Sequence, residues 1–218
     1  MREVKISARL RQDADAIWQG IIRQPFVIEL YQGDLPLEKF KFYVLQDYNF
    51  LVAMMKTLAI LAAKAGSAEV AREMLALAHL EATGEFESYE DLLGKLGYAI
   101  GDAIKAEPTE VNTSYTGFLI ATTSLRTFWE GLAAILPCFW SYSEITEYHR
   151  DKLKGNTNRL YTEWASVYLS EPYRNLVSSL RALLDTAHHV EYEKLKEVFI
   201  IASKYEAMFW STAYEMKA

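Results

Sequence analysis

Apolar residues recur every three or four positions along almost the whole sequence, and few glycines or prolines interrupt them. This spacing puts one apolar stripe on an α-helix, whereas a half-buried β-strand needs apolar and polar residues in alternation. No convincing alternating stretch occurs. The sequence therefore predicts an all-α protein, and its breaker residues place helices at about residues 9–24, 36–64, 68–96, 114–136, 137–153, 158–170, 172–189 and 190–216.

The domain organisation follows from length and from the distribution of breakers. No linker divides the 218 residues, and the connection at residues 97–108 is the best loop candidate. Neither a repeat of fixed period nor a low-complexity segment occurs. We expect residues 1–218 to form a single compact multi-helix domain of about seven to nine helices.

Composition and charge limit the partners of the chain. Hydrophobic residues make up 51% of it, enough for a large core without disulfides or metals. No apolar run approaches the roughly 18 residues of a membrane helix, so we expect a soluble protein with no membrane partner. The net charge of −6 argues against nucleic acid as a partner. The N-terminus, from Met1 to Asp15, has no continuous apolar stretch and no secretory cleavage site, which favours a cytoplasmic location.

Aromatic residues are unusually frequent, with 14 Tyr, 10 Phe and 5 Trp. Tyrosine joins an apolar ring to a polar hydroxyl, and several tyrosines lie close to polar residues that helical spacing puts among apolar neighbours. This arrangement suits a pocket for a flat ring with polar edges. An aromatic-rich core without a ligand is the alternative.

Asp47 is the first polar residue on an apolar helix face. Its neighbours one turn away are Tyr43, Val44, Phe50 and Leu51, so its side chain points toward the core. A buried carboxylate costs several kcal/mol unless hydrogen bonds or a partner charge compensate it. Asp47 therefore either bonds a donor of the protein or awaits a donor on a ligand.

Glu206 repeats this pattern near the C-terminus, where its one-turn neighbours are Ala202, Ser203, Phe209 and Trp210. Desolvation favours the neutral form of such a carboxyl group, which suits a general acid or base working near neutral pH. A glutamate at the edge of the stripe, reaching water or a lysine, is the alternative.

Cys138 is the single cysteine, which excludes an internal disulfide and a cysteine-built zinc site. It follows Pro137, where we expect the helix to kink or restart. A thiol in the first turn of a restarted helix is favoured as thiolate and can act as a nucleophile, with Tyr142 one turn along. An inert, buried thiol is the alternative.

Several short motifs occur in a fixed order along nearly the whole chain. They are Gln24-Pro25-Phe26, Leu35-Pro36, the run from Phe40 to Asp47, Ser114-Tyr115-Thr116, the run from Leu136 to Glu144, Trp164 with Tyr168, and the run from Tyr205 to Trp210. Together they resemble the TenA family, the thiaminase II or aminopyrimidine aminohydrolase group. The resemblance implies the haem-oxygenase-like helical fold.

The resemblance also implies roles for single residues. The family's nucleophile matches Cys138, its acid/base glutamate matches Glu206, and the aspartate that binds the aminopyrimidine edge matches Asp47. The aromatic residues of its pocket match Phe50, Tyr115, Tyr142 and Tyr168. Relatives have tyrosine where this chain has Phe50, which keeps the stacking surface and loses a hydroxyl. We expect this difference to affect substrate preference and not the type of reaction.

The implied activity is that of a hydrolase in thiamin salvage. Cys138 would add to the ring of 4-amino-5-aminomethyl-2-methylpyrimidine, Glu206 would move protons, and water would replace the amine to give the 5-hydroxymethyl product. Thiamin, with a thiazolium leaving group, is a second candidate substrate. The resemblance implies no cofactor and no metal, and it implies a homo-oligomer, typically a tetramer.

Other assignments stay open at this point. A non-catalytic aminopyrimidine-binding, thiamin-binding or regulatory helical protein would need Asp47 and the aromatic residues but not a thiol with an acid nearby. Glu144 either supports the site or forms a structural salt bridge. Asp185 and His188 offer only half of a two-metal site. The first histidine is His79, too late in the chain for a haem ligand in the first helix.

Overall fold

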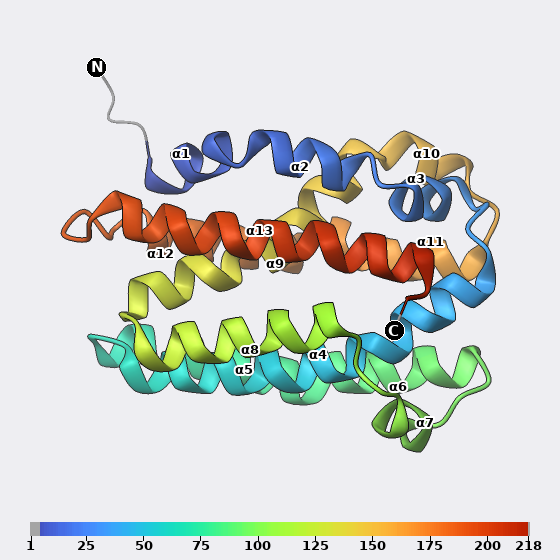
Figure 1. Cartoon of the computed structure of the whole chain (residues 1–218), viewed down its shortest axis with the longest axis horizontal. Coiled ribbons are helices and arrows are strands. Elements are labelled where there is room, and N and C mark those ends of the chain that lie inside the picture. The colour runs from blue at the N-terminus through green and yellow to red at the C-terminus, as the bar shows by residue number, and fades with distance from the viewer. Residues whose placement is uncertain (1–4, 218) are drawn as a thin grey trace.

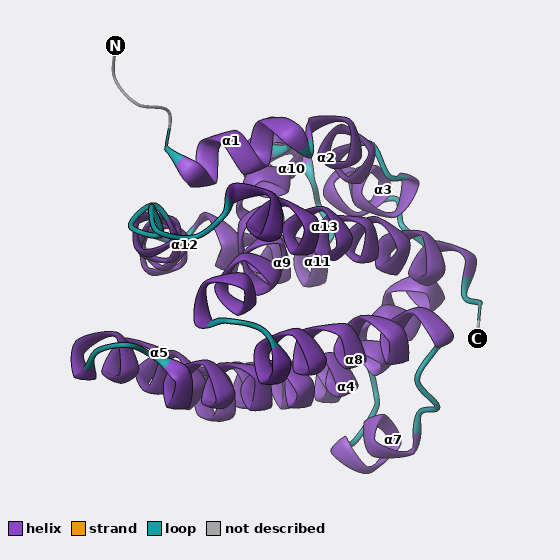
Figure 2. Ribbon diagram, turned by 60° about the vertical axis from the view of Figure 1, so that its left-hand side comes forward, coloured by secondary structure: helices purple, strands orange, loops and turns teal. Residues whose placement is uncertain are grey.

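The computed structural model describes residues 5–217, so the residues 1–4 used in the argument about location lie outside it. Within the described residues the chain is helical and has no strand, which confirms the all-α prediction (Figures 1 and 2). The helices are α1 (Ile6–Asp13), α2 (Asp15–Ile22), α3 (Pro25–Gln32), α4 (Leu37–Lys64), α5 (Ala68–Leu80), the π-helical turn η1 (Glu81–Glu85), α6 (Phe86–Lys95), α7 (Ile100–Lys105), α8 (Glu110–Leu125), α9 (Phe128–Tyr148), α10 (Arg150–Gly155), α11 (Arg159–Ser166), the 3-10 turn η2 (Val167–Leu169), α12 (Glu171–Leu184) and α13 (Tyr192–Glu215).

The expected count of seven to nine helices is wrong, because the described residues form thirteen α-helices. The predicted helix at 9–24 is divided at Ala14, whose backbone leaves helical geometry. Pro25 does more than end a helix: it starts α3, since a proline at the first position has the right φ and needs no amide hydrogen. Gly33 then ends α3 with a φ of 92°, a conformation that favours glycine.

The predicted helix boundary at Pro137 is also wrong, because α9 runs through Pro137 without a break. The true break lies at Arg126 and Thr127. The Thr127 hydroxyl accepts a hydrogen bond from the Glu130 amide at 3.3 Å, and the Glu130 carboxylate accepts one from the Thr127 amide at 3.1 Å. This reciprocal cap starts α9 at Phe128, ten residues before Cys138, so the thiol lies in the middle of a helix.

The predicted helix at 68–96 is continuous but not uniform. α5 and α6 are joined through η1, a single π-helical turn, and Gly97 ends the run with a φ of 82°. The loop expected at 97–108 contains the short helix α7. The break before α5 is as predicted: Ser67 caps its first turn by accepting a hydrogen bond from the Val70 amide.

The long helices form two groups that face each other. α4 lies against α5 and α8, whereas α13 lies against α9, with α1 and α2 along its other side (Figures 1 and 2). Buried side chains fill the space between the groups in two clusters, one around Leu58, Leu132 and Phe199 and one around Phe26, Tyr43 and Trp210. The polar residues singled out in the sequence lie where α4, α9 and α13 meet.

α4 is the one described helix that is long and apolar enough to cross a membrane by length and composition alone. Half of its most apolar window is buried against other helices, and Asp47 lies within the helix. Both features fit a core helix.

Candidate active site

Three adjoining cavities open between the two helix groups. The inner cavity lies next to Cys138, with Phe50, Tyr142 and Glu81 among its lining residues. A narrow extension reaches Glu206 and Tyr115. The outer cavity, about 240 Å³ in volume, lies between α6 and α11. Asp47 lines all three.

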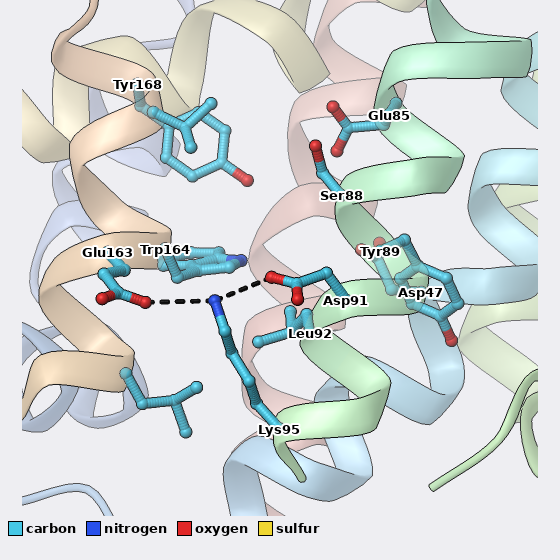
Figure 3. Close-up of a pocket in the computed structure, with 12 residues that line it drawn as sticks. Asp47, Glu85, Ser88, Tyr89, Asp91, Leu92, Lys95, Glu163, Trp164 and Tyr168 are labelled. Atoms are coloured by element: carbon cyan, nitrogen blue, oxygen red, sulfur yellow. Dashed lines mark hydrogen bonds and ion pairs between the residues drawn. The ribbon is translucent and has the colours of Figure 1, made fainter.

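Figure 3 shows the outer cavity, which is lined by Asp47 and by residues of α6 and α11. Glu85 and Tyr168 lie at its upper end in that view, and Lys95 lies at its lower end. The Lys95 ammonium joins the two walls, pairing with Asp91 of α6 at 2.7 Å and donating to Glu163 of α11 at 3.1 Å.

Asp47 lies in the middle of α4, and no described residue donates a hydrogen bond or a positive charge to its carboxyl group. The alternative of a tie to a tyrosine hydroxyl is therefore not observed. Burial, with further contributions from the charges of Glu85 and Glu206, raises the pKa of Asp47 to about 8. Its carboxyl group faces the cavities and is free to bond a ligand.

Glu206 on α13 is 3% exposed and is held by two hydroxyl groups. Tyr115 of α8 donates to its Oε1 at 2.7 Å, and Ser141 of α9 donates to its Oε2 at 3.5 Å. Burial raises the pKa of Glu206 to about 7, although the two hydrogen bonds act in the opposite direction. The group can therefore take up or release a proton near neutral pH.

Cys138 is partly accessible from the inner cavity. Burial, followed by the negative charges of Glu206 and Glu81, raises the pKa of the Cys138 thiol well above its usual range. The expected thiolate at a helix N-terminus is wrong, because α9 has no N-terminus at this point. The thiol is neutral at rest, so it needs a base to take its proton before it can attack.

Aromatic rings enclose these polar groups. The rings of Phe50 and Tyr115 lie 5.2 Å apart, and those of Tyr142 and Tyr168 lie 4.8 Å apart. The hydroxyl of Tyr142 is 3.0 Å from that of Tyr43. All the predicted site residues therefore line this one group of cavities.

Sequence reasoning missed other residues of the cavities. Among them are Glu81 and Glu85, which come from η1, and three aromatic residues, Tyr43, Phe209 and Tyr173. Glu81 carried a signal, since Leu77 and Ala78 lie one turn before it, as Tyr43 and Val44 lie before Asp47. Tyr173 carried none, because only the folded chain brings α12 to α9.

Glu144 lies outside the cavities and forms a structural ion pair. Its carboxylate accepts hydrogen bonds from the Arg11 guanidinium, with Arg11 Nε 2.9 Å from Glu144 Oε2, which joins α1 to α9. Asp185 accepts a hydrogen bond from the Ser7 amide at 2.7 Å. No three His, Cys, Asp or Glu side chains between residues 5 and 217 are arranged to hold a metal ion.

Comparison with known proteins identifies the relatives of this chain. A family model described as TENA/THI-4/PQQC family matches residues 11–216. A Helicobacter pylori protein named aminopyrimidine aminohydrolase is 32% identical, and the match covers 97% of this chain and 100% of the relative. The solved structure of a TenA homologue from P. horikoshii OT3 is 48% identical with a TM-score of 0.96, covering 98% of this chain and 100% of the other.

A more distant structure tests the predicted fold. A domain from Shewanella denitrificans OS217, described as having a heme oxygenase-like fold, superposes with a TM-score of 0.77 at 13% identity. The superposition covers 95% of this chain and 91% of that domain. This likeness concerns the fold alone, and it confirms the haem-oxygenase-like arrangement predicted from the sequence.

Proposed function

This chain belongs to the TENA/THI-4/PQQC family, and we propose that it is an aminopyrimidine aminohydrolase of thiamin salvage. The substrate would be 4-amino-5-aminomethyl-2-methylpyrimidine and the product its 5-hydroxymethyl counterpart, with thiamin as a second candidate substrate. The observation that carries the proposal is the convergence of an unpaired Asp47 carboxyl group, Glu206 with a pKa of about 7 and the Cys138 thiol around aromatic cavities. The similar protein from Helicobacter pylori is named for this activity.

Asp47 would recognise the polar edge of the ring. An aminopyrimidine offers an amino group as donor next to a ring nitrogen as acceptor. A protonated carboxyl group offers the complementary acceptor and donor, and its raised pKa of about 8 keeps Asp47 protonated at pH 7. Phe50, Tyr115, Tyr142 and Tyr168 supply the faces between which a flat ring fits.

Cys138 would add to the ring while Glu206 moves the proton. The Glu206 carboxylate takes the thiol proton, the sulfur forms a bond to the ring carbon beside the one that carries the methylene, and the proton passes to the adjacent ring nitrogen. Aromaticity is then lost, and the amine can leave the methylene with its electron pair. Its loss creates an exocyclic double bond.

Water would complete the reaction. It adds to the exocyclic methylene carbon, the sulfur leaves with its electron pair, and the ring becomes aromatic again. The net change is water plus aminomethylpyrimidine giving hydroxymethylpyrimidine plus ammonia, so no oxidant or reductant is consumed. Glu206, titrating near neutral pH, serves both the proton uptake and the proton release.

The test compares the two candidate substrates with the wild-type protein. We expect hydroxymethylpyrimidine from the aminomethyl compound, from thiamin, or from both, and the ratio of kcat/KM values gives the preferred leaving group. Binding of both compounds without turnover of either would refute the enzyme and leave a non-catalytic binding protein. Absence of binding as well would refute the site.

We also propose a homotetramer in the cytoplasm. The family resemblance supports the tetramer, and the similarity to a protein named for a metabolic activity, aminopyrimidine aminohydrolase, supports the location. Light scattering coupled to size-exclusion chromatography tests the assembly, for which we expect four times the 25.0 kDa mass of the chain. A monomer mass would refute it.

A further inference from the structure

Two carboxyl groups of the inner cavity have no part in the reaction described so far. Glu81 and Glu85 begin and end the π-helical turn η1, and both line the inner cavity together with Cys138. Single π-helical turns inside α-helices are frequent at functional sites. We therefore asked what Glu81 and Glu85 could bind in this cavity.

Glu81 is the more unusual of the two. It is 8% exposed, and no residue in the range 5–217 donates a hydrogen bond or an ion pair to its carboxyl group. Burying a carboxylate without a partner is costly. Because its side chain lines the cavity, a ligand bound there can supply the missing partner.

The charges around Glu81 indicate the kind of ligand. Asp47, Glu81 and Glu85 all line the inner cavity, and no Lys, Arg or His is among its described lining residues. Burial, together with the charges of Glu85 and Asp47, raises the pKa of Glu81 to about 8. A positive charge in the cavity would offset both effects, and would do so more strongly than a neutral hydrogen-bond donor.

The connectivity of the ring gives the position of that charge, on the premise of the proposed function. The carbon that carries the methylene lies between the carbon that carries the amino group and the carbon that the thiol attacks. Asp47 would bind the amino group on one side of this carbon, and Cys138 would attack the ring carbon on the other side. Glu81 lines the same cavity as Asp47 and Cys138, so its carboxyl group faces the space in which the methylene would lie.

We propose that Glu81, assisted by Glu85, binds the protonated amine on the substrate's methylene, so that the inner cavity is a cation subsite for the leaving group. A primary amine on a saturated carbon is protonated at pH 7, as the lysine side chain is. An ammonium group donates three charge-assisted hydrogen bonds, which match carboxylate oxygens from Glu81 and Glu85. The inference deepens the proposed function and rests on it.

The experiment uses two ligands that share the ring and differ in charge at one position. They are 4-amino-5-aminomethyl-2-methylpyrimidine, which is cationic, and 4-amino-5-hydroxymethyl-2-methylpyrimidine, which is neutral. Dissociation constants are measured by titration calorimetry at pH 7 in a Cys138→Ser background, which prevents turnover. Glu81→Gln and Glu85→Gln are the test variants, and Glu87→Gln is the control because Glu87 is exposed on α6.

We expect Glu81→Gln to weaken the cationic ligand at least about tenfold and Glu85→Gln to weaken it less, since charged hydrogen bonds are among the stronger ones. The neutral ligand should bind all variants within about twofold of the background, which also shows that they are folded. Glu87→Gln should change neither constant. Equal effects on both ligands, or no effect on the cationic one, would overturn the subsite.

The wild-type protein separates this inference from the proposed function. If wild type hydrolyses the aminomethyl compound while Glu81→Gln shows no loss specific to the cation, the subsite fails and the function stands. If the Cys138→Ser protein binds neither ligand and wild type turns over neither substrate, both proposals fail. A selective loss with an active wild type supports both.

Discussion

Replacing Tyr115 by phenylalanine removes the hydroxyl that donates to Glu206 at 2.7 Å and leaves the ring in place. The ring stacks on Tyr205 at 5.2 Å and contacts Phe50, so the packing should survive. The hydrogen bond lowers the pKa of Glu206 against the effect of burial. Its loss should therefore raise that pKa above its value of about 7.

The magnitude follows from the strength of the lost bond. A hydrogen bond to a charged group is worth about 1.5–3 kcal/mol, and 1.36 kcal/mol corresponds to one pH unit. If the Glu206 carboxylate is the base that takes the thiol proton, the acid limb of kcat/KM should move upward by about one pH unit or more. A carboxyl group that is half ionised at pH 7 would then be about one-tenth ionised, so activity at pH 7 should fall about fivefold and recover at higher pH.

The assay is the pH profile of kcat/KM for the aminomethyl substrate between pH 5.5 and 9.5. Tyr205→Phe is the matched control, because Tyr205 contacts the same ring and no hydrogen bond joins it to Glu206 among the described residues. Its profile should match wild type. An acid limb of Tyr115→Phe that stays in place, or moves to lower pH, would refute the role given to Glu206.

Two further predictions concern the stability of the empty protein. Asp47→Asn removes a carboxyl group whose pKa is raised on folding to about 8, so the folded wild type binds more protons than the unfolded chain between pH 4 and 8 and loses stability as the pH rises. In urea unfolding, the free energy of unfolding of the variant should therefore exceed that of wild type by an amount that grows from pH 5 to pH 8.5 and reaches at least about 1 kcal/mol. A difference that does not depend on pH would contradict this. Gly131→Ala would put a Cβ 2.7 Å from Leu61 Cδ2 and should lower the free energy of unfolding by about 1–3 kcal/mol. Gly117→Ala, whose Cβ would have nothing within 4 Å, should raise it by about 0.5–1 kcal/mol. If both substitutions changed the free energy of unfolding in the same direction, packing at Gly131 would not be the cause.

Helical spacing predicted the polar residues of the site well, because burial on a helix depends mainly on neighbours one turn away. Asp47 and Glu206 each have apolar residues on both sides at that distance, and both line the cavities. The four aromatic residues of the pocket were predicted from the resemblance that the ordered motifs carry. Their convergence depends on how α4, α8, α9 and η2 pack, which no local pattern contains.

Local rules failed where two signals competed. Pro137 favours a helix break, but the reciprocal cap of Thr127 and Glu130 starts α9 earlier, and burial of nearly the whole segment holds the helix through the proline. The prediction of a thiolate at Cys138 was wrong for the same reason, because it required the helix to restart at Pro137. Glu81 was not predicted, although it has apolar neighbours one helical turn away, as Asp47 does.

The central claim is that the Cys138 thiol forms a bond to the substrate ring. Turnover of 4-amino-5-aminomethyl-2-methylpyrimidine by Cys138→Ser, measured beside wild type together with the affinity of each protein for the hydroxymethyl product, tests it most directly. We predict that wild type forms product, that Cys138→Ser loses at least about a thousandfold in kcat as expected for a missing nucleophile, and that both proteins bind the product alike. Turnover by Cys138→Ser close to that of wild type would contradict covalent catalysis.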